Sequence, residues 1–214
     1  MSNNNFNQID LKEAKNIIID SLKYLFVVAS ICAIVPIILR IDIKFFGTFN
    51  QENSLIEYFQ LIFLFSTIVI FVRLSKKRPD LKYASMLIAA FYLILFIREN
   101  DDIFDLVYHG FWAPWAGFVA LIAIIYTFKD WKKGVLELAT YLKIPDMKLM
   151  IFSVMFLVVF SRLFGMGSFW KYVMKDNYVY EVKAMIEEGT ELLAYGLILY
   201  SAYLIYKYLV KEKI

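Results

Sequence analysis

The chain contains 214 residues, of which 61% are hydrophobic and only 20% are charged, and its mean hydropathy is +0.60. Soluble domains average about 45–50% apolar and about 25% charged residues, and a chain of this length has too little interior to bury the excess. This composition excludes a soluble enzyme and a disordered chain, and the net charge of +3 is too small to indicate a nucleic-acid partner. The chain is therefore predicted to be embedded in a lipid bilayer.

Six uncharged apolar runs follow one another along the chain, separated by short polar breaks. They cover residues 24–39, 58–72, 83–97, 110–128, 149–161 and 192–206. Only α-helices and closed barrels satisfy the backbone inside lipid, and these runs lack the alternation of strands. The sequence thus predicts an all-α bundle of six transmembrane helices, with residues 1–214 forming a single domain.

Two further segments show apolar residues at helical spacing between charged ones, namely 6–18 and 178–186. This pattern is typical of amphipathic helices that lie in the plane of the membrane interface. Both segments are expected to lie on the membrane rather than across it.

The distribution of lysine and arginine predicts the orientation of the helices. With both termini on one side, most of these residues flank the spans on that side, and the acidic residues are more numerous on the other. Because cytoplasmic loops carry an excess of lysine and arginine, the N- and C-termini are expected in the cytoplasm of a cell whose plasma (inner) membrane holds the chain.

Ionisable residues gather at the outward-facing ends of the predicted helices. Most of the apolar runs are shorter than the about 20 residues that a crossing requires, so flanking residues must complete each span. On the outer side these are Glu57, Gln60, Arg98, Glu99, Arg162, Glu187, Glu188 and Glu191. A charge at membrane depth costs about 2.5–3.5 kcal/mol, so charges from several helices are expected to meet and neutralise one another.

Helical spacing gives these residues a geometry. Glu187 or Glu188 shares a helix face with Glu191, since they lie four and three residues before it, and Glu57 and Gln60 are three apart. Asp105 and His109 are four apart and would face the same way if the third helix continued that far. The run Asp101–Asp105 also resembles the DDxxD motif through which prenyl-diphosphate enzymes hold magnesium.

Three kinds of chemistry are open to such a cluster. Carboxylates suit hard divalent cations (Mg²⁺, Mn²⁺ or Ca²⁺), arginines suit a phosphate-bearing anionic lipid headgroup, and a desolvated carboxylate suits acid–base catalysis on a lipid-linked substrate. The candidate catalytic groups and metal ligands are Glu57, Glu99, Asp102, Asp105, Glu188 and Glu191. The candidate substrate- or phosphate-binding residues are Arg98, Arg162, Gln60 and His109.

Three stretches resemble a group of uncharacterised bacterial polytopic membrane proteins. They are Glu52-Asn-x-x-x-Glu57-x-x-Gln60, Arg98-Glu99-Asn-Asp and Glu187-Glu188-x-x-Glu191-Leu192. The resemblance implies that these positions form one site, and it implies no particular activity. The chain departs from the group after the second stretch, where Asn100 to Asp105 replace a Trp-Gly-Gln-Arg-like run, and it lacks the later His-Asn pair.

Structural explanations compete with the functional ones. The aspartates can form a solvated loop, the glutamates can favour the N-terminus of the last helix, and Arg98 and Arg162 can be interfacial anchors. Two other functions also remain open. One is a cation or proton transporter or channel, and the other is a non-catalytic membrane assembly partner held by charge pairs.

Overall fold

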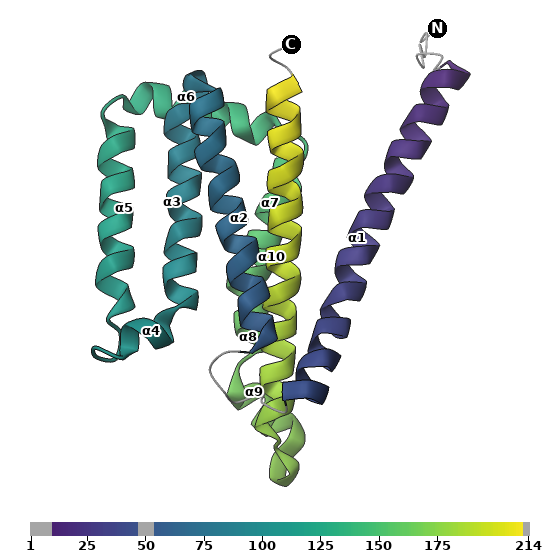
Figure 1. Ribbon diagram of the computed structural model, residues 1–214, viewed down its shortest axis with the longest axis vertical. Coiled ribbons are helices and arrows are strands. Elements are labelled where there is room, and N and C mark those ends of the chain that lie inside the picture. The colour runs from purple at the N-terminus through teal and green to yellow at the C-terminus, as the bar shows by residue number, and fades with distance from the viewer. Residues whose placement is uncertain (1–9, 47–53, 212–214) are drawn as a thin grey trace, which may run out of the picture.

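The computed structural model of the chain describes residues 10–46 and 54–211, and every regular element in these ranges is helical (Figure 1). The α-helices are α1 (Leu11–Phe46), α2 (Leu55–Lys77), α3 (Lys82–Glu99), α4 (Asp101–Asp105), α5 (Trp112–Phe128), α6 (Trp131–Lys143), α7 (Met147–Met155), α8 (Arg162–Phe164), α9 (Gly167–Met174) and α10 (Tyr180–Lys211). Short 3₁₀ turns, η1 (Pro79–Leu81) and η3 (Lys175–Asn177), precede α3 and α10, and a π-helical turn, η2 (Phe156–Ser161), joins α7 to α8.

Five stretches of the described chain are long and apolar enough to cross a membrane. They are α1, α2, α3 with η1, the continuous run from α7 to α8, and α10. The number becomes six if α5 and α6, which meet at an angle of 104°, are counted as one broken span. The prediction of an all-α chain is therefore confirmed for the described residues, and several of its helices are long and apolar enough to span a membrane.

The central helix of the bundle is α10, which packs against α1, α2 and α7 (Figure 1). Its buried face is rich in small residues, among them Gly189, Ala194 and Ala202, which let neighbouring helices approach closely. The apolar core between α2, α3 and α10 includes Phe71 and Tyr92, whose rings stack with centroids 6.1 Å apart.

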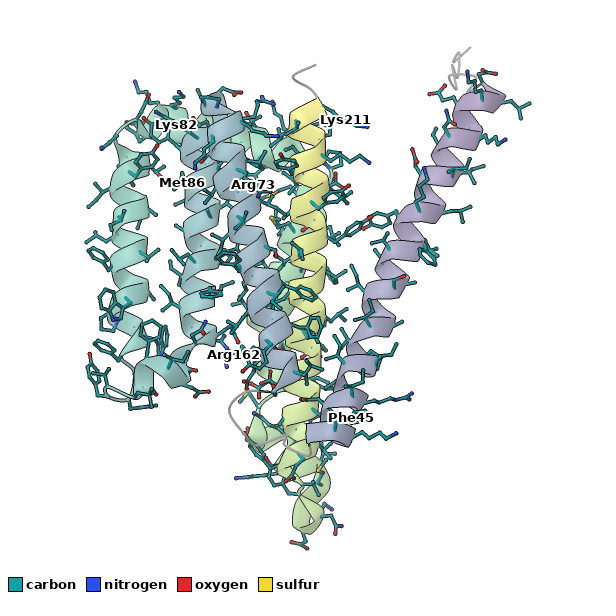
Figure 2. All side chains as sticks on the ribbon, viewed as in Figure 1. Phe45, Arg73, Lys82, Met86, Arg162 and Lys211 are labelled. Carbon is teal, nitrogen blue, oxygen red and sulfur yellow. The ribbon has the colours of Figure 1, made fainter. Side chains whose placement is uncertain are left out.

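The ends of the bundle differ in what they carry. The start of α1 and the end of α10 lie at the same end, together with α6, which runs across the helix ends (Figure 1). Figure 2 shows Lys82 and Lys211 toward this end and Arg162 and Phe45 toward the opposite one. The helix ends that carry Glu57, Glu99 and Glu188 therefore lie away from the start of α1 and the end of α10.

The two expected interfacial helices are not separate elements. Residues 11–18 form the first turns of α1, and residues 180–186 form the first turns of α10, each continuous with the apolar span that follows. Residues 6–9 lie outside the described part of the chain. The prediction of separate helices was wrong because no proline interrupts either junction, Gly189 is accommodated within α10, and a helix that has started extends at little cost.

The amphipathic helix that the structure does contain is α6, within the polar break expected between the fourth and fifth spans. Asp130 accepts a hydrogen bond from the Lys133 N–H and so caps its start. One face buries Glu137 and Tyr141 against the bundle, while Leu136 on the other face is 69% exposed. Glu137 Oε2 accepts a hydrogen bond from the Ala84 N–H at 2.9 Å, which fastens α6 to the first turn of α3.

Candidate functional site

A cluster of charged and polar side chains joins α2, α3 and α10 at the end of the bundle opposite the termini. We call it the carboxylate cluster, and it consists of Glu57, Gln60, Arg98, Glu99, Glu188, Glu191 and Tyr195. It lies at the first turns of α2, the last turn of α3 and the third to fifth turns of α10. Helices from three parts of the chain thus bring their polar ends together.

Arg98 and Tyr195 link α3 to α10 within this cluster. Arg98 Nη2 lies 3.1 Å from Glu99 Oε1 and 4.0 Å from Glu191 Oε1. The Tyr195 hydroxyl donates a hydrogen bond to the same Glu99 oxygen at 2.8 Å. Glu191 is only 3% exposed, and a carboxylate held this far from solvent requires a nearby cation such as Arg98.

Gln60 links α2 to α10 on the other side of the cluster. Its side-chain amide donates to Glu188 Oε2 at 2.9 Å and to the Glu188 backbone carbonyl at 3.4 Å. Gln60 is 1% exposed. A buried amide with this bonding has a fixed position, so it fixes the Glu188 carboxylate in turn.

Glu57 is positioned by the start of α2. Ser54 accepts a hydrogen bond from the Glu57 N–H at 3.2 Å, and the Glu57 carboxylate accepts one from the Ser54 N–H at 3.3 Å, which together form a capping box. The Leu55 N–H donates to Asp42 Oδ1 of α1 at 3.1 Å. These contacts set the direction in which the first turn of α2 presents its carboxylate.

A cavity of about 210 Å³ opens beside the cluster, between α2, α3 and α4. Its lining includes three of the predicted acidic site residues, Glu57, Glu99 and Asp102. The remaining wall is formed by Asn100 and by the largely apolar side chains of Tyr58, Leu61, Ile103 and Leu106. Acidic groups and apolar surface therefore border the same space.

Arg162 contacts a glutamate outside the carboxylate cluster. Its Nη1 lies 3.8 Å from Glu187 Oε1, and Lys183, one turn earlier on α10, binds the other Glu187 oxygen. The Arg162 side chain is 50% exposed. Arg162 and Glu187 thus form an ion pair at the rim, next to the buried groups of Glu188 and Glu191.

The π-helical turn determines where Arg162 lies. By adding a residue to the helical turn, η2 brings Ser161 to face α10, where its hydroxyl accepts a hydrogen bond from Thr190 at 3.1 Å. Gly165 follows, and a Cβ at this position would lie 2.8 Å from the Glu187 carboxyl carbon. The absence of a side chain there lets the chain pass close to Glu187.

Asp105 and His109 lie apart from the cluster, in the connection between α3 and α5. His109 Nδ1 is 2.7 Å from Asp105 Oδ2, and the Gly110 N–H donates to Asp105 Oδ1 at 2.7 Å. The His109 side chain is fully exposed. The predicted Asp105–His109 contact is therefore present, but it stabilises a turn at Gly110, which has a φ of 84°, and it lies in the connection rather than on the third helix.

The pKa values of two aspartates in this connection are shifted in opposite directions. The pKa of Asp105 is held below its ordinary value, mainly by the hydrogen bond from the Gly110 N–H and to a smaller extent by His109. The pKa of Asp101 is raised, mainly by its partial burial and to a smaller extent by the adjacent charge of Asp102. The DDxxD-like run therefore does not act as one set of equivalent carboxylates.

The geometry of the acidic groups bears on metal binding. Within residues 10–46 and 54–211, no three His, Cys, Asp or Glu side chains meet closely enough to hold a metal ion. Five of the six carboxylates predicted as ligands are instead divided among Arg98, Gln60, the capping box and the Gly110 turn, and the sixth, Asp102, lines the cavity. They do not form a coordination sphere.

Sequence reasoning missed Tyr195 and Lys183 as members of the site. Tyr195 lies one turn beyond Glu191, and Lys183 lies one turn before Glu187. The four-residue spacing was a usable signal in both cases, because residues at i and i+4 share a helix face.

Comparisons with known proteins found no match: no family model, no curated protein and no solved structure matches the chain.

Proposed function

We propose that the chain is a six-span membrane protein that binds the amine-bearing headgroup of a membrane lipid in the cavity beside the carboxylate cluster. The α5 helix is its fourth crossing, since it contains 17 residues and no charge. Both termini then lie in the cytoplasm, and the cavity opens at the level of the outer headgroups. The observation that carries the proposal is the joint lining of one space by Glu57, Glu99 and Asp102 together with apolar side chains.

The charge of the cavity favours a cation. Three carboxylates line it, and Arg98, the nearest arginine, is already paired with Glu99 and Glu191. An ammonium group offers three hydrogen-bond donors to such acceptors. The apolar wall of Leu61, Ile103 and Leu106 provides a surface for the glycerol and acyl portion of a lipid.

The other ligands expected from the sequence are less well accommodated. A bare divalent ion requires several oxygen ligands converging on one point, whereas the described acidic groups are held apart by separate partners. A phosphate alone requires donors, yet both Arg98 and Arg162 already face glutamates. An ammonium group needs only the acceptors that line the cavity.

A transporter or channel would need polar groups that continue through the bundle. The hydroxyls of Thr67, Ser153 and Ser201 each donate to a backbone carbonyl of their own helix. These groups are engaged locally, and apolar residues of the core lie between them. Headgroup binding at one end is therefore the better supported function.

The experiment that tests the proposal compares lipids that differ only in the headgroup. The purified chain in detergent is titrated with phosphatidylethanolamine or with phosphatidylglycerol of the same acyl chains, and thermal stability is measured. We expect phosphatidylethanolamine to stabilise the protein more, because the cavity is acidic. The substitutions E57Q and D102N should each reduce the apparent affinity for phosphatidylethanolamine by about tenfold, since a charge-assisted hydrogen bond contributes about 1.5–3 kcal/mol.

The substituted residues are chosen so that the fold is kept. A glutamine at position 57 preserves the capping box, and Asp102 is exposed. The matched control is E181Q, because Glu181 is an exposed glutamate of α10 outside the cavity lining. Equal stabilisation by both lipids, or an equal loss in the E181Q control, would refute the proposal.

A further inference from the structure

A second cavity lies on the other side of α2, between α1 and α10. Its volume is about 420 Å³, and we call it the α1 niche. Its lining includes Ile31, Ile34, Phe63, Ile70, Leu199 and Tyr203. Nearly all of the exposed lining is carbon, and none of the residues is charged. The niche thus differs in chemistry from the acidic cavity beside the carboxylate cluster.

A close contact bounds the niche toward the end of the bundle that carries the carboxylate cluster, where a Cβ at Gly189 would lie 3.0 Å from Leu39 Cδ1. Within the lining itself, a Cβ at Gly196 would lie 3.0 Å from Ile31 Cγ2. The two glycines therefore let α1 press directly against α10. Toward the other end, α1 diverges from the bundle (Figure 1).

An aromatic contact crosses the gap where the helices diverge. The rings of Tyr24 on α1 and Tyr200 on α10 have centroids 5.8 Å apart. The niche is therefore limited at both ends, has Phe63 and Ile70 of α2 as its back wall, and lies within the membrane-spanning parts of all three helices.

We infer that the α1 niche binds one hydrocarbon chain of a membrane lipid. The lining offers almost no polar group to an ordered water, which needs two to four polar partners. Left empty, it would deprive its lining of packing contacts. Since the niche lies at the depth of the acyl chains, a hydrocarbon chain supplies the missing contacts, and it holds α1 to the bundle along a stretch where few α1 side chains are buried.

This inference is independent of the headgroup-binding proposal. The niche offers no acceptor or donor for a headgroup, so the chain that fills it is selected by its apolar character alone. The amount of lipid that the niche variants I34W and L199W release should therefore be the same for phosphatidylethanolamine and phosphatidylglycerol, and it should be unchanged by E57Q.

The test measures lipid that remains bound through purification. The chain is reconstituted with either lipid, extracted in mild detergent, and analysed by native mass spectrometry. We expect a stoichiometric lipid on the wild type and a loss of at least about tenfold in the I34W and L199W variants, whose added rings fill the niche. The control is I62W, on a half-exposed α2 residue outside the niche lining.

The I34W variant is expected to fold normally, because Ile34 is 47% exposed and a larger ring there disturbs no core packing. Undiminished lipid on both niche variants would overturn the inference. So would a lipid-free wild-type dimer that the same variants convert to monomers, since a second copy would then fill the niche. A failure of headgroup discrimination alone would affect only the headgroup-binding proposal.

Discussion

Arg98 is the residue at which the buried charges of α3 and α10 meet. It lies within 4.0 Å of both Glu99 and Glu191, each of which is almost fully enclosed. Removing one partner of a buried ion pair costs about 3–5 kcal/mol, because the other charge is left uncompensated. The arrangement therefore fixes the ends of these two helices relative to one another, whatever ligand occupies the cavity beside them.

Asp101 and Asp105 should have opposite effects on stability at neutral pH. The lowered pKa of Asp105 means that its charge stabilises the folded state, and this contribution is lost as the pH falls through the folded-state pKa. The raised pKa of Asp101 means that its charge opposes folding above that pKa. At pH 7 we expect D105N to lower the melting temperature and D101N to raise it.

The measurement is a series of thermal melts between pH 7 and pH 3. The D101N difference should shrink as the pH falls through the raised pKa of Asp101, above the ordinary aspartate value of about 3.9, and the D105N difference should shrink as the pH falls below that value. Melting temperatures of D101N and D105N that shift in the same direction at pH 7 would contradict the prediction.

At the scale of elements, the position of α6 depends on contacts that the spacing of apolar residues in the sequence does not predict. Its start approaches the end of α5 so closely that a Cβ at Gly134 would lie 2.8 Å from Thr127 Cγ2. Thr127 cannot easily rotate away, since its hydroxyl donates to the Ala123 carbonyl at 2.8 Å. The bend of 104° between α5 and α6 therefore depends on a glycine at position 134.

We expect G134A to reduce the free energy of unfolding by about 1–3 kcal/mol, the usual cost of overpacking. The double variant G134A/T127S should recover most of this loss, because serine lacks the Cγ2 methyl group but retains the hydroxyl. The matched control is G117A in α5, where a Cβ would have no neighbour within 4 Å. Denaturant titration in mixed micelles measures all three, and a loss in G117A as large as in G134A would disprove the explanation.

For the whole molecule, the distribution of charge and the direction of the helices agree. The start of α1 and the end of α10 lie at one end of the bundle, together with α6, which contributes Lys132 and Lys133 (Figure 1). The carboxylate cluster lies at the other end. A bundle built in this way has a basic end and an acidic end. The basic end is expected in the cytoplasm, because cytoplasmic flanks retain lysine and arginine.

Site-directed labelling tests this orientation. In a C32S background, cysteines are introduced at His109 and at Lys132, which belong to opposite ends of the bundle, and intact cells are treated with a membrane-impermeant maleimide. We expect the H109C variant to be labelled in intact cells and the K132C variant only after lysis. The reverse pattern would invert the proposed orientation and place the carboxylate cluster on the cytoplasmic side.

Much of the secondary structure could be predicted because membrane helices carry their signal locally, in the length and composition of each apolar run. The same holds for pairs such as Glu188 and Glu191, whose spacing alone places them on one face. The continuation of α1 and α10 through their amphipathic starts could not be predicted from periodicity, because a surface helix and an extended span have the same pattern until a break separates them.

Composition and local spacing were sufficient to predict a helical chain, helices apolar enough to span a membrane, and acidic residues grouped at helix ends, because these properties are local. The partner of each charge depends instead on how distant segments pack: Gln60 binds Glu188, Arg98 lies between Glu99 and Glu191, and Asp105 accepts a hydrogen bond from the Gly110 N–H. The reason is that the rotation and axial position of one helix against another depend on packing between distant segments, such as the close approach of α1 to Gly189 and Gly196 of α10.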